Sequence, residues 1–249
     1  MALTRTRMFA GLLMALCCGG IGFLDDYIKV VKKRNLGLTD KQKMFCQLLV
    51  GTAYALWLYM AGGTVIEVPF VGQVDMGLWF IPFCVFVIAL GTNAVNLTDG
   101  VDGLCGTVSF VACLFFVAAA GLVGYFQMGL IAAVFAGSLA GFLMWNLHPA
   151  KVLMGDTGSL FIGGGLCALG FGMGRPLLLI PVGIIYLVEA ASVILQVGYF
   201  KITHGKRLFK MSPIHHHFEM SGWSENRIVT VFSLITLVGA AVSMLLLYV

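Results

Sequence analysis

Residues 105–122 read Cys-Gly-Thr-Val-Ser-Phe-Val-Ala-Cys-Leu-Phe-Phe-Val-Ala-Ala-Ala-Gly-Leu, and none of these side chains is charged. A helix needs about 20 apolar residues to cross the hydrocarbon core of a bilayer. Seven further runs of this kind occur along the chain, so the sequence predicts an all-α, polytopic transmembrane bundle of eight helices. We expect one integral-membrane domain over residues 1–249. The predicted spans are 8–24, 43–62, 76–92, 105–122, 127–145, 158–174, 177–199 and 228–248.

The composition excludes a soluble globular protein. Hydrophobic residues make up 60% of the chain, charged residues 10%, and the mean hydropathy is +0.99, which leaves too little polar surface to cover a globule in water. A β-barrel would show alternating strands of about ten residues instead of continuous apolar runs. The cysteines lack metal-ligand spacing, and Gly163–Gly165 lies inside an apolar run. Both are therefore predicted to pack between helices.

The charged residues sort to one side of the predicted membrane. If the spans alternate, four loops share that side, near 25–42, 93–104, 146–157 and 200–227. The positive-inside rule makes this side cytoplasmic, because it holds all but three of the 15 Lys and Arg residues. The exceptions are Arg5, Arg7 and Arg175.

The acidic residues and histidines follow the same sorting. All five histidines and most carboxylates lie in the cytoplasmic loops, and Glu189 is the one acid expected within a span. A cation transporter or channel should instead place ionisable groups near the midplane, where they are costly and are kept for function. The pattern therefore favours a site on the cytoplasmic face.

The first polar motif is Gly22-Phe23-Leu24-Asp25-Asp26-Tyr27, at the end of the first span. Two carboxylates within about 4 Å of each other would repel by roughly 4 kcal/mol at an effective dielectric constant of about 20. Such repulsion favours a bound cation or a shared proton. The alternative is a solvated helix end in which an Asp pairs with a Lys.

The second motif, residues 93–103, reads Asn-Ala-Val-Asn-Leu-Thr-Asp-Gly-Val-Asp-Gly. Its Asn and Asp residues recur at every third position, which predicts a row along one helical face, and the two glycines would loosen the backbone. A helix cap needs only one such residue, whereas a row of amide and carboxylate oxygens suits a hard cation and sugar hydroxyls. The row consists of Asn93, Asn96, Asp99 and Asp102.

The third motif runs from Asn146 to Ser159 and contains His148-Pro149-Ala150-Lys151 and Gly155-Asp156-Thr157-Gly158. Asp156 precedes an apolar run, so it is expected to be the N-cap of the next helix. The same helix N-terminus offers free N–H groups and positive potential to an anion or a Mg²⁺-phosphate. The motif alone leaves both interpretations open.

The fourth motif, Pro213-Ile214-His215-His216-His217-Phe218-Glu219, follows a basic stretch. No cysteine is near in sequence to complete a structural zinc site, and the run is internal and too short for a tag. A phosphate-contacting or proton-handling cluster is favoured over a solvated loop. Together the four motifs predict one Mg²⁺-dependent phosphoryl-transfer site at the membrane edge, acting on phosphates and a lipid.

The four motifs closely resemble those of the phospho-N-acetylmuramoyl-pentapeptide-transferase family, in the polyprenyl-phosphate N-acetylhexosamine-1-phosphate transferase superfamily. The resemblance covers nearly the whole chain. It implies transfer of phospho-MurNAc-pentapeptide from UDP-MurNAc-pentapeptide to undecaprenyl phosphate, giving lipid I and UMP in peptidoglycan synthesis. It also implies membrane lipid and a second copy of the chain as partners, with no nucleic acid. The implied location is the bacterial cytoplasmic (inner) membrane, with the active site facing the cytoplasm.

The resemblance further implies roles for single residues. Asp156 is the implied Mg²⁺ ligand, and Asp25 and Asp26 form the acidic catalytic pair. It remains open whether Asp25 deprotonates the lipid phosphate or an Asp first forms a phospho-enzyme. The implied catalytic set is completed by His215 and His216. The implied substrate-binding residues are Asn93, Asn96, Asp99, Asp102, Asn146, Gly155, Ser159 and His217, of which Asp102 and Asn146 match the family's uracil pocket.

One departure from the family pattern concerns the start of the chain. The family has ten helices, and this chain begins at what resembles the third. We therefore expect the first two helices, with a Thr-Pro-Thr-Met-Gly-Gly-like segment, to be absent, either by truncation or in a natural short form. The nearest alternative activity is a polyprenyl-phosphate transferase for UDP-N-acetylglucosamine, which the intact triple histidine with its Pro-Ile lead and Phe-Glu tail disfavours.

Overall fold

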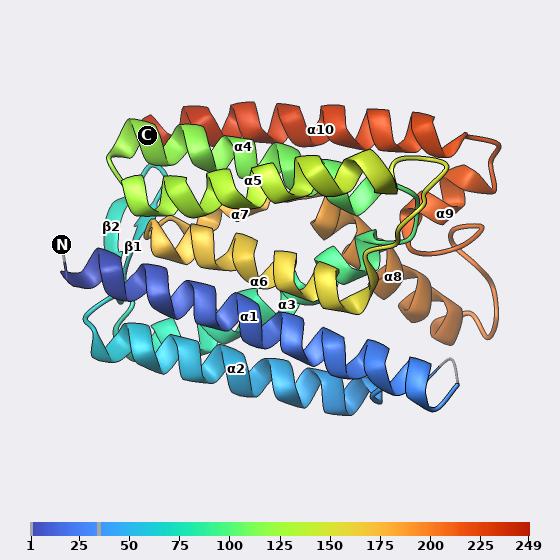
Figure 1. Cartoon of the computed structure of the whole chain (residues 1–249), viewed down its shortest axis with the longest axis horizontal. Helices are drawn as coiled ribbons and strands as arrows, with labels where there is room; N and C mark the ends of the chain where they lie inside the picture. The colour runs from blue at the N-terminus through green and yellow to red at the C-terminus, as the bar shows by residue number, and fades with distance from the viewer. Residues whose placement is uncertain (1, 34–35) are drawn as a thin grey trace.

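Eight long helices form the bundle in the computed structural model, which describes residues 2–33 and 36–249. They lie roughly along its long axis, as Figure 1 shows, and they match the eight predicted runs in order. Their bounds are α1 (Ala2–Val31), α2 (Asp40–Met60), α3 (Phe80–Thr98), α4 (Leu104–Val123), α5 (Phe126–Asn146), α6 (Gly155–Gly172), α8 (Ile184–Ile202) and α10 (Glu225–Leu245).

Short elements connect these helices. A two-stranded antiparallel hairpin, with Val65 opposite Asp75 and Val68 opposite Gly72, fills the loop between α2 and α3, where no strand was predicted. Its strands are β1 (Val65–Val68) and β2 (Gly72–Asp75). The remaining elements are η1 (Gly77–Trp79), η2 (Pro176–Leu178), α7 (Leu179–Val182), α9 (Ile214–Glu219) and η3 (Leu246–Tyr248).

The chain is a multi-pass membrane protein. Within the described residues, 6 helices are long and apolar enough to cross a membrane. The two other long helices have physical reasons to be less apolar. Charged side chains occupy the first turn of α2, and α6 is rich in glycine and largely enclosed by other helices, so it has little contact with lipid. The predicted span 177–199 is divided, since α7 ends at Val182 and α8 begins at Ile184.

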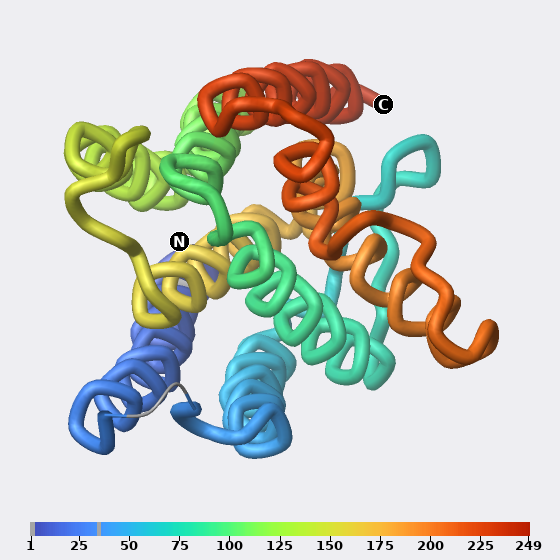
Figure 2. Tube along the Cα trace, turned by 90° about the vertical axis from the view of Figure 1, so that its right-hand side faces the viewer, coloured from blue at the N-terminus to red at the C-terminus, as the bar shows by residue number. Residues whose placement is uncertain are grey.

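Glycines allow α6 to pack closely between α1 and α3, an arrangement visible in the end-on view of Figure 2. A Cβ atom at Gly163 would lie 2.7 Å from the Cα atom of Thr92 in α3. A Cβ atom at Gly164 would lie 3.2 Å from the Cα atom of Ala15 in α1. The prediction that this glycine run serves helix packing is confirmed.

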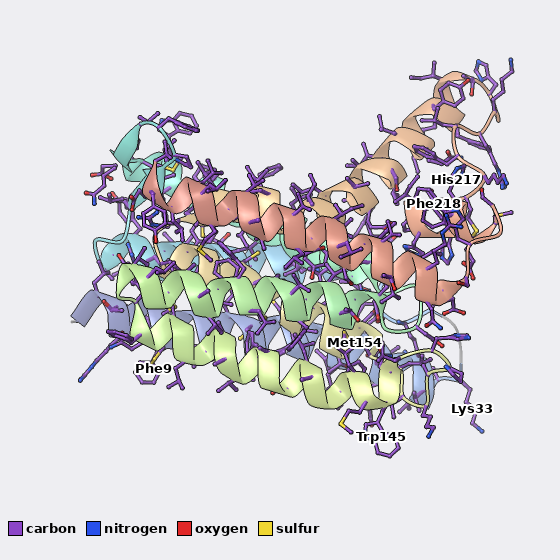
Figure 3. The ribbon with its side chains drawn as sticks, turned by 90° about the horizontal axis from the view of Figure 1, so that it is seen from above. Phe9, Lys33, Trp145, Met154, His217 and Phe218 are labelled. Carbon is purple, nitrogen blue, oxygen red and sulfur yellow. The ribbon has the colours of Figure 1, made fainter. Side chains whose placement is uncertain are left out.

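The four sequence motifs meet at one end of the bundle, which we call the polar end. Here α1, α3, α5 and α8 finish and α2, α4, α6 and α10 begin, whereas both chain termini lie at the opposite end (Figure 1). Figure 3 shows Lys33 and His217 at the polar end and Phe9 toward the other. Of the expected basic residues of this side, Arg34 lies outside the described residues.

The packing of α1 on α6 can be tested at Gly22. A Cβ atom there would lie 2.6 Å from the Thr157 nitrogen, whereas nothing lies within 4 Å of a Cβ at Gly20. Gly22→Ala should destabilise the protein by about 1–3 kcal/mol through overpacking. Gly20→Ala, the matched control, should be neutral or stabilising by up to about 1 kcal/mol because alanine favours helix. Thermal unfolding in detergent measures both, and a Gly22→Ala protein as stable as the Gly20→Ala protein would contradict the packing.

Candidate active site at the polar end

Three carboxylates converge where α1 meets α6. Asp25 and Asp26 lie near the end of α1 and Asp156 lies in the first turn of α6, and one oxygen of each falls within 4.8 Å of the others. Their side chains are 1%, 31% and 18% exposed, respectively. Gly155 adopts a φ of +66°, and a Cβ there would lie 2.9 Å from Asp26 Oδ2, so this close approach favours glycine. We call these three residues the carboxylate trio.

Two lysines lie against the trio. Lys29 Nζ is 2.6 Å from Asp25 Oδ2 and 3.1 Å from Asp156 Oδ2, and Lys43 Nζ is 2.6 Å from the same Asp156 oxygen. Neither lysine was predicted from the sequence as a site residue. For Lys29 a signal existed, because it follows Asp25 by four residues and Asp26 by three, the spacing of neighbours on a helix. Lys43 comes from α2 and carries no local signal.

Hydrogen bonds fix each carboxylate of the trio. The Leu38 N–H donates to Asp25 Oδ1 at 2.7 Å. The Thr157 N–H and hydroxyl donate to Asp26 Oδ2 at 2.9 and 2.7 Å. Burial alone would raise the pKa of Asp156, but its hydrogen bonds and the charge of Lys43 hold that pKa below its usual range. Asp156 is therefore an anion at neutral pH.

The expected N-cap role of Asp156 is wrong. The cap position of α6 is Met154, which makes no side-chain cap hydrogen bond, and the helix begins at Gly155. The carboxylate instead accepts a hydrogen bond from Asn96 Nδ2 at 2.8 Å. Asn96 also donates to the Ser159 hydroxyl at 2.8 Å, and that hydroxyl donates to the Gly155 carbonyl at 3.0 Å. Three predicted substrate-binding residues thus border the trio.

The predicted row of four Asn and Asp residues does not form. Helix α3 ends at Thr98, so Asp99 becomes its C-cap and Asp102 lies in the following turn. Asn93 donates to Gln47 Oε1 at 2.7 Å and not to the trio. Burial, with the charges of the neighbouring Asp156 and Asp26, raises the pKa of Asp99 to about 6, and His215 acts in the opposite direction.

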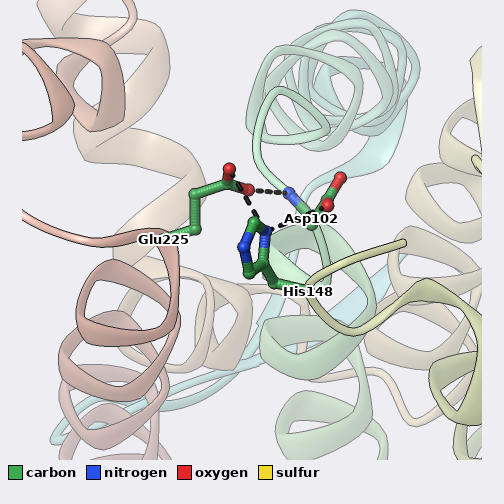
Figure 4. A group of neighbouring side chains, drawn as sticks. All are labelled: Asp102, His148 and Glu225. Carbon is green, nitrogen blue, oxygen red and sulfur yellow. Dashed lines mark hydrogen bonds and ion pairs between the residues drawn. The ribbon is translucent and has the colours of Figure 1, made fainter.

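Asp102 belongs to a second cluster, shown in Figure 4. His148 Nδ1 lies 3.3 Å from Asp102 Oδ2 and 3.3 Å from Glu225 Oε1. The Asp102 N–H donates to Glu225 Oε2 at 3.1 Å. The cluster joins the turn before α4, the loop after α5 and the start of α10. Nearby, Asn146 donates to the Val152 carbonyl at 2.9 Å. Glu225 was not predicted, and its only sequence signal is its place in the first turn of a helix.

The three consecutive histidines make three different contacts. His215 is fully buried, and its Nδ1 lies 3.1 Å from Glu189 Oε2. His216 Nδ1 is 2.8 Å from Glu219 Oε2, at the surface. His217 Nδ1 accepts the N–H of Lys210 at 3.1 Å. The predicted single shared site is therefore three neighbouring groups: the carboxylate trio, the Asp102 cluster and the histidines.

An apolar cavity of about 300 Å³ opens beside α3, between α4, α6, α7 and α8. It extends along α3 from Phe83 to Val95, one residue before Asn96, and Phe116 and Leu166 contribute to its walls. The polar end thus combines oxygen ligands for a hard cation, ammonium groups for phosphate and an adjoining apolar space.

Comparison with known proteins identifies the family. A model described as "Glycosyl transferase family 4" matches residues 8–173. A phospho-N-acetylmuramoyl-pentapeptide-transferase of Clostridium perfringens (strain 13 / Type A) is 49% identical over 221 residues, which cover 88% of this chain and 69% of that protein. One of Listeria monocytogenes serotype 4b (strain F2365) is 47% identical over 231 residues, covering 90% and 70%. One of Pelotomaculum thermopropionicum is 50% identical over 247 residues, covering 95% and 76%.

The helical membrane fold, with this match, defines a polytopic membrane transferase of glycosyl transferase family 4. Within that family, the chain belongs to the phospho-N-acetylmuramoyl-pentapeptide-transferases, in agreement with the resemblance of its four sequence motifs.

The Asp102 cluster makes a testable link between loops. Glu225→Ala removes the acceptor of the Asp102 N–H, so hydrogen exchange at residues 101–104 should become faster. The unfolding free energy should fall by about 1 kcal/mol, as for loss of one hydrogen bond. Asn226→Ala changes the exposed neighbouring residue and is the matched control. Unchanged exchange in the Glu225→Ala protein would show that this contact does not hold the turn.

Proposed function

We propose that this protein transfers phospho-MurNAc-pentapeptide from UDP-MurNAc-pentapeptide to undecaprenyl phosphate, releasing UMP and forming lipid I. The observation that carries the proposal is the carboxylate trio with Lys29 and Lys43 at one end of a membrane bundle. Relatives that are 47–50% identical carry the name of this activity. A diphosphate donor and a lipid phosphate acceptor both require charge neutralisation at a membrane edge, which this site can supply.

We further propose that the reaction depends on Mg²⁺, and the residues present fit that ion. The trio offers hard oxygen ligands from three carboxylates, and the cations that now balance them are the movable ammonium groups of Lys29 and Lys43. Asp156 and Asp26 would hold the ion, with Asp25 behind them. When bound, Mg²⁺ supplies neutralisation of the diphosphate charge.

The carboxylates and lysines of the site have different proposed roles. Asp25 is almost fully enclosed, so it orients Lys29 and does not contact substrate. Asp26 is more exposed than Asp25, so it is the carboxylate of this pair that a substrate can reach. Lys29 and Lys43 each lie between carboxylates, and both can turn toward the diphosphate when it binds. An oxygen of the acceptor phosphate then forms a bond to the sugar-linked phosphorus, and the bond from that phosphorus to UMP breaks.

The acceptor's hydrocarbon chain fits the apolar cavity beside α3. Its walls are almost wholly apolar and reach Val95, the residue before Asn96 in α3, so a lipid bound there with its head toward the polar end would present its phosphate near the trio. A polyprenyl tail bound in this way gains van der Waals contacts with the apolar walls, which is the main source of packing energy inside a bilayer.

The orientation of the site follows from the charge distribution. We propose that the polar end faces the cytoplasm of a bacterial inner membrane, because the positive-inside rule applies to its short basic loops.

Asp102 and Asn146 are proposed to contact the nucleotide base. A homodimer is also proposed, from the family resemblance.

Release of UMP by the purified protein tests the function. With undecaprenyl phosphate and Mg²⁺ we expect turnover of UDP-MurNAc-pentapeptide, none of UDP-N-acetylglucosamine, and none after chelation of the metal. Asp156→Asn should lower kcat by about 100-fold or more, as loss of a charged transition-state stabiliser does. Asp75→Asn is the control, because Asp75 is exposed and bonded to Thr64 at the opposite end. Equal turnover in the Asp156→Asn and wild-type proteins would refute the metal assignment.

A further inference from the structure

A buried ionisable pair lies beneath the active site. Glu189, in α8, and His215, in α9, are both 0% exposed, and His215 Nδ1 lies 3.1 Å from Glu189 Oε2. Apart from this ion-pair distance, both oxygens of Glu189 and both ring nitrogens of His215 are buried without a hydrogen bond of good geometry among the described residues. A carboxylate inside a membrane bundle is costly and is usually retained for a function. The reaction outlined above makes no use of Glu189.

The imidazole of this pair faces the active site. Its ring lies directly against Gly100: a Cβ atom at that position would collide with His215 Nε2 and would lie 2.8 Å from Cε1. Gly100 follows Asp99, and the Asp99 carboxylate lies within electrostatic range of His215. The titratable groups around the ring are Glu189 from α8, in ion-pair distance, His216, whose ring centroid is 4.2 Å away, and Asp99 from the end of α3, within electrostatic range.

Charge balance determines which hydrogens the ring carries. A pair with no access to water is expected to be neutral overall, because an isolated buried charge is very costly. It is then either a carboxylate with an imidazolium, or a carboxylic acid that donates to Nδ1 of a neutral imidazole. In both forms Nε2 bears a hydrogen. The Nε2–H is thus a donor on the side of the ring that faces the Asp99–Gly100 turn.

We propose that Glu189 is a positioning residue of the transferase: it holds His215 with Nε2 protonated and directed at the Asp99 turn, and His215 in turn holds the Asp99 carboxylate toward the donor substrate. This inference rests on the proposed function for the substrate. It assigns to His215 a role behind the site instead of direct contact with phosphate, in keeping with its complete burial. Groups that orient a functional residue in this way typically contribute about 10- to 100-fold to activity or affinity.

Three variants of the chain separate this role from simple packing. Glu189→Gln keeps the shape but removes the charge that fixes the proton arrangement. Glu189→Asp keeps the charge on a shorter side chain. Ser192→Ala is the matched control, because Ser192 is buried in the same helix and its hydroxyl donates to the Glu189 backbone carbonyl, at 2.7 Å, and not to the Glu189 side chain.

We expect kcat/KM for the nucleotide donor to fall about 10- to 100-fold in Glu189→Gln. Activity should be partly restored in Glu189→Asp and unchanged in Ser192→Ala, with all melting temperatures close to the wild-type value. Equal activity of Glu189→Gln and wild type would overturn the proposal. The proposal would also be overturned if activity and melting temperature fell together in Glu189→Gln and Glu189→Asp restored neither. That result would show that the pair has only a structural role.

A spectroscopic measurement tests the pair independently of catalysis. In protein labelled with ¹⁵N-histidine, the His215 signals are assigned by their loss in His215→Gln. We expect Nε2 to be protonated in the wild type, and the signals to shift in Glu189→Gln but not in Ser192→Ala. An unprotonated Nε2 in the wild type would refute the proposal even if UMP release succeeds. If UMP release fails in the wild type, the proposed function fails while this spectrum still decides the state of the pair.

Discussion

The contact between α1 and α6 at Gly22 is the constraint on which the rest of the site depends. Because Gly22 has no side chain, the backbone of Asp156 and Thr157 can lie directly against α1. That approach brings the ends of two helices, separated by more than a hundred residues in sequence, close enough for their carboxylates to share one set of cations. Helix packing through small residues, which is common in membrane bundles, here also creates the chemistry of the site.

The three carboxylates of the trio repel one another when they are ionised. Two carboxylates about 4 Å apart repel by roughly 4 kcal/mol at an effective dielectric constant of about 20, and three in one place require compensation. Lys29 and Lys43 supply it within the protein, together with donors from Leu38, Thr157 and Asn96. Because the ammonium groups of Lys29 and Lys43 can move, the carboxylates can exchange them for a metal ion, and the lysines can turn to the diphosphate when it binds. The enclosed Glu189–His215 pair would support the same region from the membrane side.

Predictions of helix position and of glycine-mediated packing, which rest on local sequence patterns, agree with the structure. Long apolar runs predicted the positions of the eight long helices, although only 6 of them among the described residues are apolar enough to cross a membrane. Glycine within such a run predicted the close packing of α6. Predictions that needed the exact end of a helix were less successful: α3 stops at Thr98, so Asp99 and Asp102 leave its face, and Met154, not Asp156, caps α6. Contacts between distant segments leave little or no local signal, so the sequence did not predict Lys43 or Glu225 as site residues, nor that the three adjacent histidines make different contacts.

The central claim is that Asp156 and Asp26 of the carboxylate trio bind the metal. Binding of Mn²⁺, a paramagnetic substitute for Mg²⁺, can be measured by electron paramagnetic resonance on the purified protein without any turnover. The claim predicts that Asp156→Asn and Asp26→Asn each weaken Mn²⁺ binding about tenfold or more. Asp102→Asn, which alters the other group of potential ligands with His148 and Glu225, should leave it unchanged. Loss of Mn²⁺ binding in Asp102→Asn with retention in Asp156→Asn would contradict the account.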